Sequence, residues 1–273
     1  MRKICIINQK GGVAKTTTAV SIAAGLARQD KRVLLVDLDP QGNVAHSLTS
    51  SKRLNLYDFL IDKCAYIDCT TSIGKNLDLI HSDESLTKID VHFAKQANPS
   101  QIIKKKFSDI QDYDYIIFDC APSLGILNQN ALLFSDEAII PVSTTYLSLT
   151  GLTYMLEAIK DLNQHFNHDL KISHIIPTLH DRRLKTNRNM LAKLQEDHGT
   201  TITNPVRVNS KLAEAPASGK SIFNYAPKSR GAEDYGKIVD IIIENEKHAQ
   251  VKRASQPISM RVQQLMADIE IED

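Results

Sequence analysis

The chain has 273 residues, 42% of them hydrophobic, which is enough to bury an α/β core in one domain. Its formal net charge of +1 excludes a global field that attracts nucleic acid or membrane, and no apolar run has the length of a transmembrane helix. The four cysteines lack the close pairing of a zinc site, and the first residues leave no room for a signal peptide before the first predicted strand. We therefore expect a cytoplasmic protein with reduced thiols.

Apolar runs alternate with helical patterns along the chain, which is typical of βαβ units. Strands are predicted at 3–7, 33–38, 77–80, 114–119, 137–142 and 172–177. Helices are predicted near 15–29, 125–134, 150–165, 186–197 and 233–246, with weaker patterns at 85–96 and 100–108. The predicted fold class is α/β: a mainly parallel, twisted sheet with helices on both faces. We expect one domain over 1–247, then a C-terminal segment 248–273 with a short linker and a candidate helix at 258–270.

A glycine-rich segment joins the first predicted strand to the first predicted helix. Strand, glycine-rich turn and helix form the context of a phosphate-binding loop, in which backbone amides and the helix N-terminus hold phosphates. In such loops a lysine at the position of Lys15 reaches the β- and γ-phosphates, and a threonine at the position of Thr16 holds Mg²⁺. We therefore expect the chain to bind a nucleoside triphosphate. The predicted binding residues are Lys10, Gly11, Gly12, Val13, Ala14, Lys15, Thr16 and Thr17.

Two residues of this loop depart from the general pattern. Lys10 precedes the first glycine, where the phosphate cradle needs no second lysine, so it is a candidate to reach the phosphates of a neighbouring subunit. Ala14 replaces the second glycine, and its methyl group is tolerable if its φ angle is negative.

Two predicted strands end in carboxylates. The strand at 33–38 contains Asp37 near its end and is followed by Asp39, and the strand at 114–119 ends at Asp119. Because ligands bind beyond the carboxyl ends of strands in open α/β sheets, these side chains should point toward the phosphate loop. There they could order the Mg²⁺ shell or orient the water that attacks the γ-phosphate.

Together these motifs resemble the ParA/MinD group of ATPases with a deviant Walker A loop. The chain contains Lys-Gly-Gly-x-x-Lys-Thr-Thr, Asp-x-Asp-Pro-Gln-Gly-Asn and a strand ending in Asp with Pro-Ser soon after, in that order. The segments 211–220 and 227–233 resemble the C-terminal signatures of the ParA/Soj branch. The resemblance covers about residues 1–247. It implies a P-loop NTPase fold and a weak, Mg²⁺-dependent ATPase that forms an ATP-sandwich homodimer.

The resemblance also implies roles for individual residues. Lys10 matches the lysine that reaches the partner's nucleotide, and Gly11 matches a glycine kept small by the approach of two subunits. Asp39 matches the carboxylate associated with the attacking water, Asp119 matches the Walker B aspartate, and Asp37 would support the metal shell. One departure is the segment 144–151, where Thr145 and Thr150 replace the glutamates common in ParA-like chains. The candidate catalytic residues are Lys10, Lys15 and Asp39, the candidate Mg²⁺ ligands are Thr16, Asp37 and Asp119, and the candidate dimer residues are Lys10 and Gly11.

Residues 171–237 carry twelve lysines and arginines against six aspartates and glutamates, a local excess of positive charge. Because ParA-like proteins resemble DNA binders in this region, we expect non-specific binding to double-stranded DNA, which depends on salt and reads no sequence. No helix-turn-helix pattern precedes the ATPase motifs, so specific operator binding is not expected. The candidate contacts are Arg182, Arg183, Lys185, Arg188, Arg207, Lys211, Lys220, Lys228 and Arg230.

Rival functions stay open at this point. A MinD-like membrane ATPase needs a basic amphipathic C-terminal helix, but this tail ends in acidic residues that anionic lipid repels, so no stable membrane association is expected. For an iron–sulfur ATPase, Cys64 and Cys69 lie in the wrong region, and the later Soj-like segments argue against a metabolic ligase. The family resemblance implies a ParB-like centromere-binding partner and a place on the nucleoid. The cargo (plasmid, chromosome or protein assembly) is left undecided.

Overall fold

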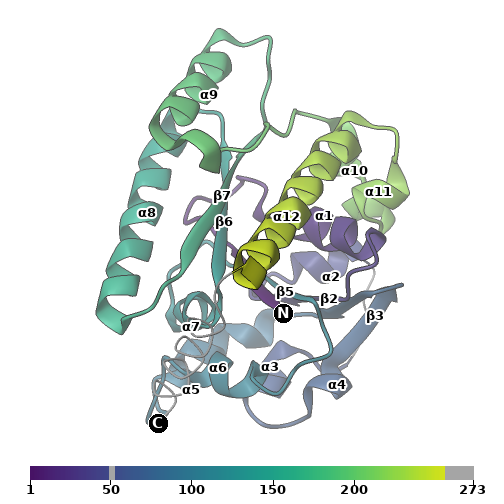
Figure 1. The fold of residues 1–273 in the computed structure, drawn as a ribbon. Helices are drawn as coiled ribbons and strands as arrows, with labels where there is room; N and C mark the ends of the chain where they lie inside the picture. The colour runs from purple at the N-terminus through teal and green to yellow at the C-terminus, as the bar shows by residue number, and fades with distance from the viewer. Residues whose placement is uncertain (49–52, 256–273) are drawn as a thin grey trace.

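The computed structural model describes residues 1–48 and 53–255, which form one sheet between two layers of helices (Figure 1). The strands are β1 (Arg2–Ile6), β2 (Val33–Asp37), β3 (Thr70–Gly74), β4 (Leu77–Ile80), β5 (Tyr115–Asp119), β6 (Glu137–Ser143) and β7 (Lys171–Thr178). Their order across the sheet is β3-β4-β2-β5-β1-β6-β7. Every pairing is parallel except that of β3 with β4. The predicted mainly parallel sheet is therefore confirmed.

Helices cover both faces of the sheet. The longer ones are α1 (Lys15–Arg28), α7 (Ile126–Phe134), α8 (Tyr146–Phe166), α9 (Lys185–His198) and α12 (Arg230–Ser255). The short ones are α2 (Asn43–Leu48), α3 (Leu56–Leu60), α4 (Tyr66–Cys69), η1 (Glu84–Lys88), α5 (Ile89–Phe93), α6 (Ile102–Phe107), η2 (Gly199–Thr201), α10 (Ser210–Glu214), η3 (Pro216–Ser218) and α11 (Ile222–Tyr225). Within residues 1–48 and 53–255, none of these helices combines the length and apolarity needed to cross a bilayer.

Two apolar cores hold the sheet between its helices, and β2 shows how the sequence builds both. Leu34 and Val36 belong to the core under α3 and α5–α8, whereas Val33 and Leu35 belong to the core under α1, α11 and α12. Because successive side chains of a strand point to opposite faces, an unbroken apolar run is what a strand covered on both faces requires. The second core is tight: a Cβ added to Gly25 of α1 would lie 2.5 Å from Val239 of α12.

The six predicted strands are confirmed within one residue at each end, but β3 was missed. This edge strand is polar and only partly buried, so it lacks the apolar run of the central strands. Two helices are longer than predicted, since α8 begins at residue 146 and α12 continues to Ser255. The segment 248–255, expected to be a linker, is therefore helical. The candidate helix at 258–270 lies outside the described residues, and the division of the chain near 247 stays a prediction.

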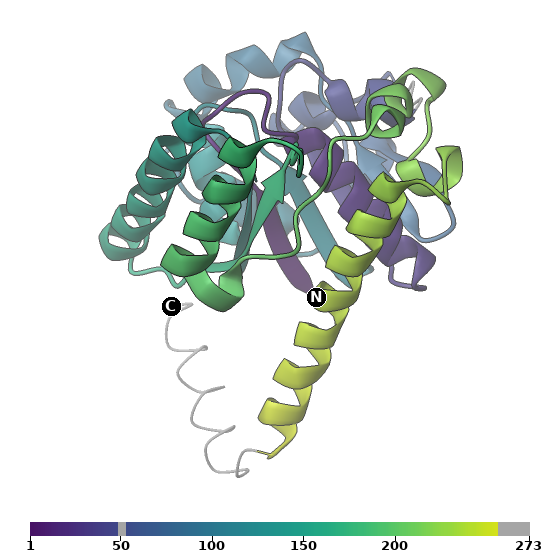
Figure 2. The ribbon, with the colours of Figure 1, turned by 90° about the horizontal axis from the view of Figure 1, so that it is seen from above.

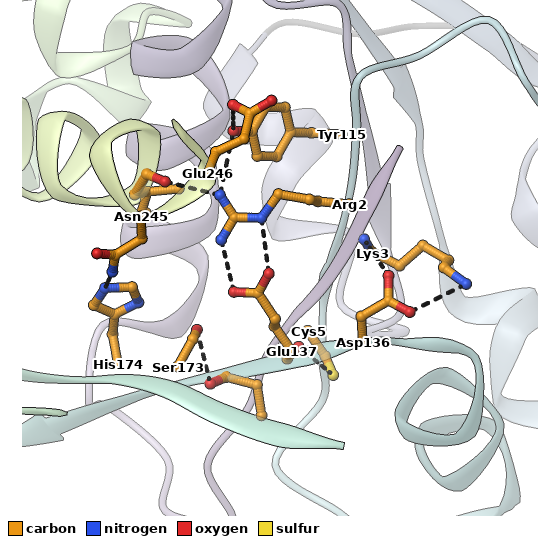
Figure 3. Close-up of polar contacts among 12 residues, drawn as sticks. Arg2, Lys3, Cys5, Tyr115, Asp136, Glu137, Ser173, His174, Asn245 and Glu246 are labelled. Atoms are coloured by element: carbon orange, nitrogen blue, oxygen red, sulfur yellow. Dashed lines mark hydrogen bonds and ion pairs between the residues drawn. The ribbon is translucent and has the colours of Figure 1, made fainter. Parts of the chain in front are cut away.

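A polar network ties α12 to the amino ends of the central strands (Figure 3). The Arg2 guanidinium donates two hydrogen bonds of 2.7 Å to Glu137 and one of 2.8 Å to the Ile242 carbonyl. The Tyr115 hydroxyl donates to Glu246 at 2.7 Å. Through these contacts α12 is fastened at the sheet end opposite the phosphate loop, and it then runs on past the body of the protein (Figure 2).

Candidate nucleotide site

The predicted phosphate loop connects β1 to α1 and is anchored on both sides. The Thr178 hydroxyl of β7 donates to the Val13 carbonyl at 3.0 Å. The Asn8 side chain donates to the Pro141 carbonyl at 2.8 Å and accepts from the Lys10 amide at 2.9 Å. The loop is therefore anchored to β6 and β7 by these hydrogen bonds. Gly11 and Gly12 take no part in them and are exposed.

Ala14 departs from the condition set by the sequence. Its φ and ψ are +67° and +36°, in the left-handed region, so the condition of a negative φ is not met. The cause is the turn into α1: Ala14 is the N-cap residue, and its carbonyl accepts the first helical hydrogen bond from Thr18 at 2.9 Å. A non-glycine residue in this conformation costs about 1–2 kcal/mol, so the loop carries local strain that a glycine would avoid.

The Lys15 side chain folds back against the phosphate loop. Its side chain is buried, and Nζ donates to the Lys10 carbonyl at 3.2 Å. Burial lowers the pKa of Lys15, while the carboxylates of Asp119 and Asp39 act in the opposite direction. The structure thus brings the predicted lysine and two of the predicted aspartates into one electrostatic site.

Asp37 and Asp119 are direct register partners on the neighbouring strands β2 and β5. Asp37 accepts from the backbone amides of Asp39 at 3.0 Å and Val44 at 3.1 Å, so both of its oxygens are used. Burial nevertheless raises the pKa of Asp37 to about 7. Asp37 therefore holds the turn that presents Asp39, and its direct contact with a metal stays a prediction.

Asp119 is the buried carboxylate with one oxygen that accepts no hydrogen bond from the described residues. It is 1% exposed, and its Oδ1 has no hydrogen-bond partner among the described residues. The side chain of Thr16 is near enough to act on its pKa, in the lowering direction. Burial and the neighbouring Asp37 raise the pKa of Asp119 well above its usual range. A buried, unpaired carboxylate oxygen beside a threonine hydroxyl fits Mg²⁺, which takes one or two protein oxygens and completes its shell with phosphates and water. Among residues 1–48 and 53–255, no cluster of three or more His, Cys, Asp or Glu side chains is arranged to hold a metal ion.

Asp39 lies at the mouth of the site in a tight turn. Its Oδ1 accepts from the Gln41 amide at 3.0 Å, and its carbonyl accepts from the Ser82 hydroxyl at 2.5 Å. Gly42, at φ +63°, closes this turn, and a Cβ there would lie 2.8 Å from the Ser82 carbonyl. The turn is therefore fixed by its own backbone and by the segment after β4.

Lys10 has a contact that the sequence did not predict. Its Nζ donates to the hydroxyl of Ser148 at 3.0 Å. Ser148, at the start of α8, also contacts the hydroxyls of Ser143 at 2.6 Å and Thr145 at 2.8 Å. This cluster lies in the segment 144–151 where glutamates were expected and at its junction with β6. In a single subunit Lys10 therefore rests on a neutral hydroxyl cluster.

The nine candidate DNA contacts fall into separate groups. Four of them follow β7 or begin α9, whereas Lys211, Lys220, Lys228 and Arg230 lie in or beside α10–α12, to the right of α9 in Figure 1. Arg207 is engaged within the protein, by Asp234 at 2.6 Å and Glu233 at 2.8 Å. Asp181 pairs with Arg183, and Glu214 pairs with Lys211. Among the described residues, the exposed candidates that form no ion pair are Arg182, Lys185, Arg188, Lys220, Lys228 and Arg230.

Comparison with known proteins assigns this architecture to a family. A family model described as an AAA domain matches residues 1–172. The sporulation initiation inhibitor protein Soj of Bacillus subtilis is 39% identical over 238 residues, which cover 85% of this chain and 94% of Soj. The chromosome partitioning protein ParA of Caulobacter vibrioides is 31% identical, with 93% and 98% covered. The chain belongs to the ParA/Soj family of P-loop ATPases.

Solved structures agree with this family assignment at the level of the fold. A cobyrinic acid a,c-diamide synthase from Mycobacterium smegmatis with a bound ATP analogue and magnesium has a TM-score of 0.78 and 30% identity, covering 90% of this chain and 96% of the synthase. A plasmid partition protein from Borrelia burgdorferi bound to AMPPNP also has a TM-score of 0.78, at 23% identity, covering 89% and 99%. The P-loop NTPase fold expected of a ParA/Soj chain is therefore confirmed.

Proposed function

We propose that this protein is an ATP-dependent partition switch. ATP and Mg²⁺ would join two subunits across their phosphate loops, the dimer would bind double-stranded DNA without sequence preference, and slow hydrolysis would release it. The observation that carries this proposal is the environment of Gly11. This residue is exposed, its φ is not positive, and a Cβ built on it meets no atom within 4 Å. Nothing within one described subunit requires a glycine there, whereas a closely approaching second subunit would.

Nucleotide binding rests on groups that face one another at the carboxyl ends of β1, β2 and β5. The backbone amides of residues 11–17 and the Lys15 ammonium would hold the phosphates. Thr16 and Asp119 would hold Mg²⁺, whose charge offsets that of the buried carboxylates and the phosphates. Support comes from the unpaired Asp119 oxygen and from the related synthase solved with an ATP analogue and magnesium.

Hydrolysis would be slow because the described site contains no strong base. Asp37 is taken up by backbone amides, which leaves Asp39 as the carboxylate able to orient a water molecule. We propose that Lys10 leaves Ser148 and reaches the nucleotide of the partner subunit when ATP is bound. Dimerisation would then be linked to the γ-phosphate and reversed by its loss.

DNA binding would use the candidate cations that are not held by internal carboxylates. A dimer presents each such cation twice, so two weak surfaces act as one stronger one. The relatives named for chromosome partitioning support this role. We further propose a ParB-like stimulating protein and a cytoplasmic, nucleoid-associated location. Binding to a membrane surface is the competing proposal, and the acidic tail on which it was judged lies outside the described residues.

The test is DNA retardation with ATP, with ADP and without nucleotide, over a series of salt concentrations. We expect ATP-dependent binding to any sequence, and Lys220→Ala and Arg230→Ala should each lower the salt slope by about two, because the dimer loses two phosphate contacts with each substitution. The matched control is Arg207→Ala, which should lower thermal stability because Asp234 loses its partner. Binding to anionic vesicles but not to DNA would contradict the proposal, and so would a failure to bind either.

A further inference from the structure

The segment that follows Asp119 lies at the centre of the nucleotide site. Residues 120–125 connect β5 to α7, and β5 lies between β2 and β1 in the sheet. The segment therefore leaves the sheet between the Asp39 turn and the phosphate loop. Its first residues are fixed by the sheet, since the Asp119 carbonyl accepts from Leu38 at 2.9 Å and the Cys120 amide donates to Ile6 at 3.1 Å. Beyond Cys120 it depends on side chains.

Asn128 of α7 holds the first half of this segment. Its amide nitrogen donates to the Ala121 carbonyl at 2.9 Å and also to the Ser123 carbonyl. The side chain is 2% exposed, and its Oδ1 has no hydrogen-bond partner among the described residues. A buried acceptor without a partner costs about 1–3 kcal/mol of stability. The two hydrogen bonds made by the side-chain nitrogen of Asn128 offset this cost.

Asp90 of α5 holds the other end. Its Oδ1 accepts from the Leu127 amide at 3.0 Å, at the first turn of α7. Its Oδ2 lies so close to Gly125 that a Cβ there would be 2.3 Å away. The carboxylate therefore rests on the Gly125 backbone and caps the helix that carries Asn128. Two side chains from different helices thus hold the two ends of the part that lies beyond Cys120, residues 121–125.

We propose that Asn128 and Asp90 are positioning residues of the magnesium site, which fix residues 121–125 and thereby the orientation of the Asp119 carboxylate. This proposal rests on the magnesium role proposed for Asp119. Groups that orient a metal ligand without touching the metal typically contribute 10–100-fold to metal affinity. Loss of either residue should therefore weaken Mg²⁺ binding more than it weakens nucleotide binding.

Asn130 provides a matched control on the same helix. It is 1% exposed, and it accepts from the Ile102 and Ile103 amides at 2.8 and 3.2 Å. Its nitrogen donates to the carbonyls of Pro99 and Ile126. None of these bonds reaches residues 120–125. Asn130→Ala therefore reports the cost of losing a buried amide without disturbing the Asp119 segment.

The experiment measures binding of a fluorescent ATP analogue as Mg²⁺ is titrated, after each variant has been shown to unfold cooperatively. We expect Asn128→Ala to raise the Mg²⁺ concentration at half-saturation by about tenfold, with binding in EDTA unchanged. Asp90→Ala should do the same, whereas Asp90→Asn, which keeps an acceptor for Leu127, should stay near wild type. If Asn128→Ala fails to fold, Gly125→Ala replaces it, because its methyl group displaces Asp90.

The outcomes separate the two proposals. Wild-type Mg²⁺ dependence in Asn128→Ala or its replacement would overturn the positioning role, as would an equal shift in Asn130→Ala. Asp119→Asn serves as the reference variant. If Asp119→Asn leaves Mg²⁺ dependence unchanged, the magnesium role of Asp119 is wrong; if it shifts while Asn128→Ala does not, only the positioning role is wrong.

Discussion

The Nζ of Lys10 donates a 3.0 Å hydrogen bond to Ser148 within its own subunit. Ser148 is 1% exposed and shares its hydroxyl with Ser143 and Thr145, so the lysine is held by a preformed acceptor. If ATP draws Lys10 to a second subunit, this bond must break. The resting contact therefore opposes dimerisation by roughly the strength of one hydrogen bond in each subunit, about 1 kcal/mol per subunit.

Ser148→Ala should accordingly favour the ATP dimer. Without its acceptor, Lys10 of each subunit no longer loses a bond of about 1 kcal/mol on leaving, and the protein concentration for half-dimerisation should fall by about 30-fold. Analytical ultracentrifugation with ATP measures this, and Lys10→Ala should abolish the ATP-dependent dimer in the same assay. A weaker dimer in Ser148→Ala would show that Ser148 supports Lys10 after dimerisation instead of before it.

The two neighbouring glycines of the loop should respond differently to a side chain. Gly11→Val should fold with normal thermal stability, because no atom lies within 4 Å of the added Cβ, yet it should not dimerise with ATP. Gly12→Val should instead lose stability, since Gly12 has φ +70°, a conformation that a β-branched residue rarely adopts. Thermal unfolding and sedimentation of both variants check this. A dimerising Gly11→Val protein would remove the main support for a close subunit contact at this loop.

Ala14→Gly should stabilise the protein. It relieves a left-handed conformation that costs about 1–2 kcal/mol, but a glycine also gains about 0.4–1 kcal/mol of entropy in the unfolded chain. The free energy of unfolding should therefore rise by up to about 1.6 kcal/mol. Ala158→Gly, inside α8, is the control and should lower it by a similar amount. Urea denaturation compares the two, and equal losses in both would mean that the Ala14 strain is absent in solution.

The carboxylate pair predicts how stability without nucleotide depends on pH. Burial raises the pKa of Asp37 to about 7 and that of Asp119 above its usual range, so the folded state holds protons that the unfolded state has released above pH 4. Stability should therefore fall as pH rises from about 4 through 7, by at most about 1.4 kcal/mol per unit for each group.

Asp119→Asn should reduce this slope, because an amide cannot ionise. Mg²⁺ with a nucleotide should reduce it as well, since the cation favours the ionised carboxylates. Chemical denaturation at pH 5 and pH 8, with and without Mg²⁺ and nucleotide, gives the four comparisons. A stability that rises over this range in the wild-type protein would contradict the assignment of raised pKa values to the pair.

Local sequence patterns predicted the centre of the fold but not its edges. The apolar runs of β1, β2 and β5 are legible because both faces of these strands are buried, and the polar edge strand β3 gives no such signal. The phosphate loop and Asp119 could be predicted because their spacing along the chain matches their chemistry. Ser148, Asn128 and Asp90 could not, because their roles depend on residues brought close only by packing. The run of hydroxyl side chains within residues 143–148 was the one signal in the sequence that could have indicated the Lys10 contact.

The register between β2 and β5 sets Asp37 opposite Asp119, and this register is held by residues that take no part in chemistry. Val33 to Val36 send alternate side chains into two different cores. A slip of one residue in either strand would exchange the contents of those cores and turn one aspartate to the opposite face. We therefore expect that an insertion or deletion among the apolar residues of β2 or β5 would weaken magnesium binding, although it would change no residue of the site itself.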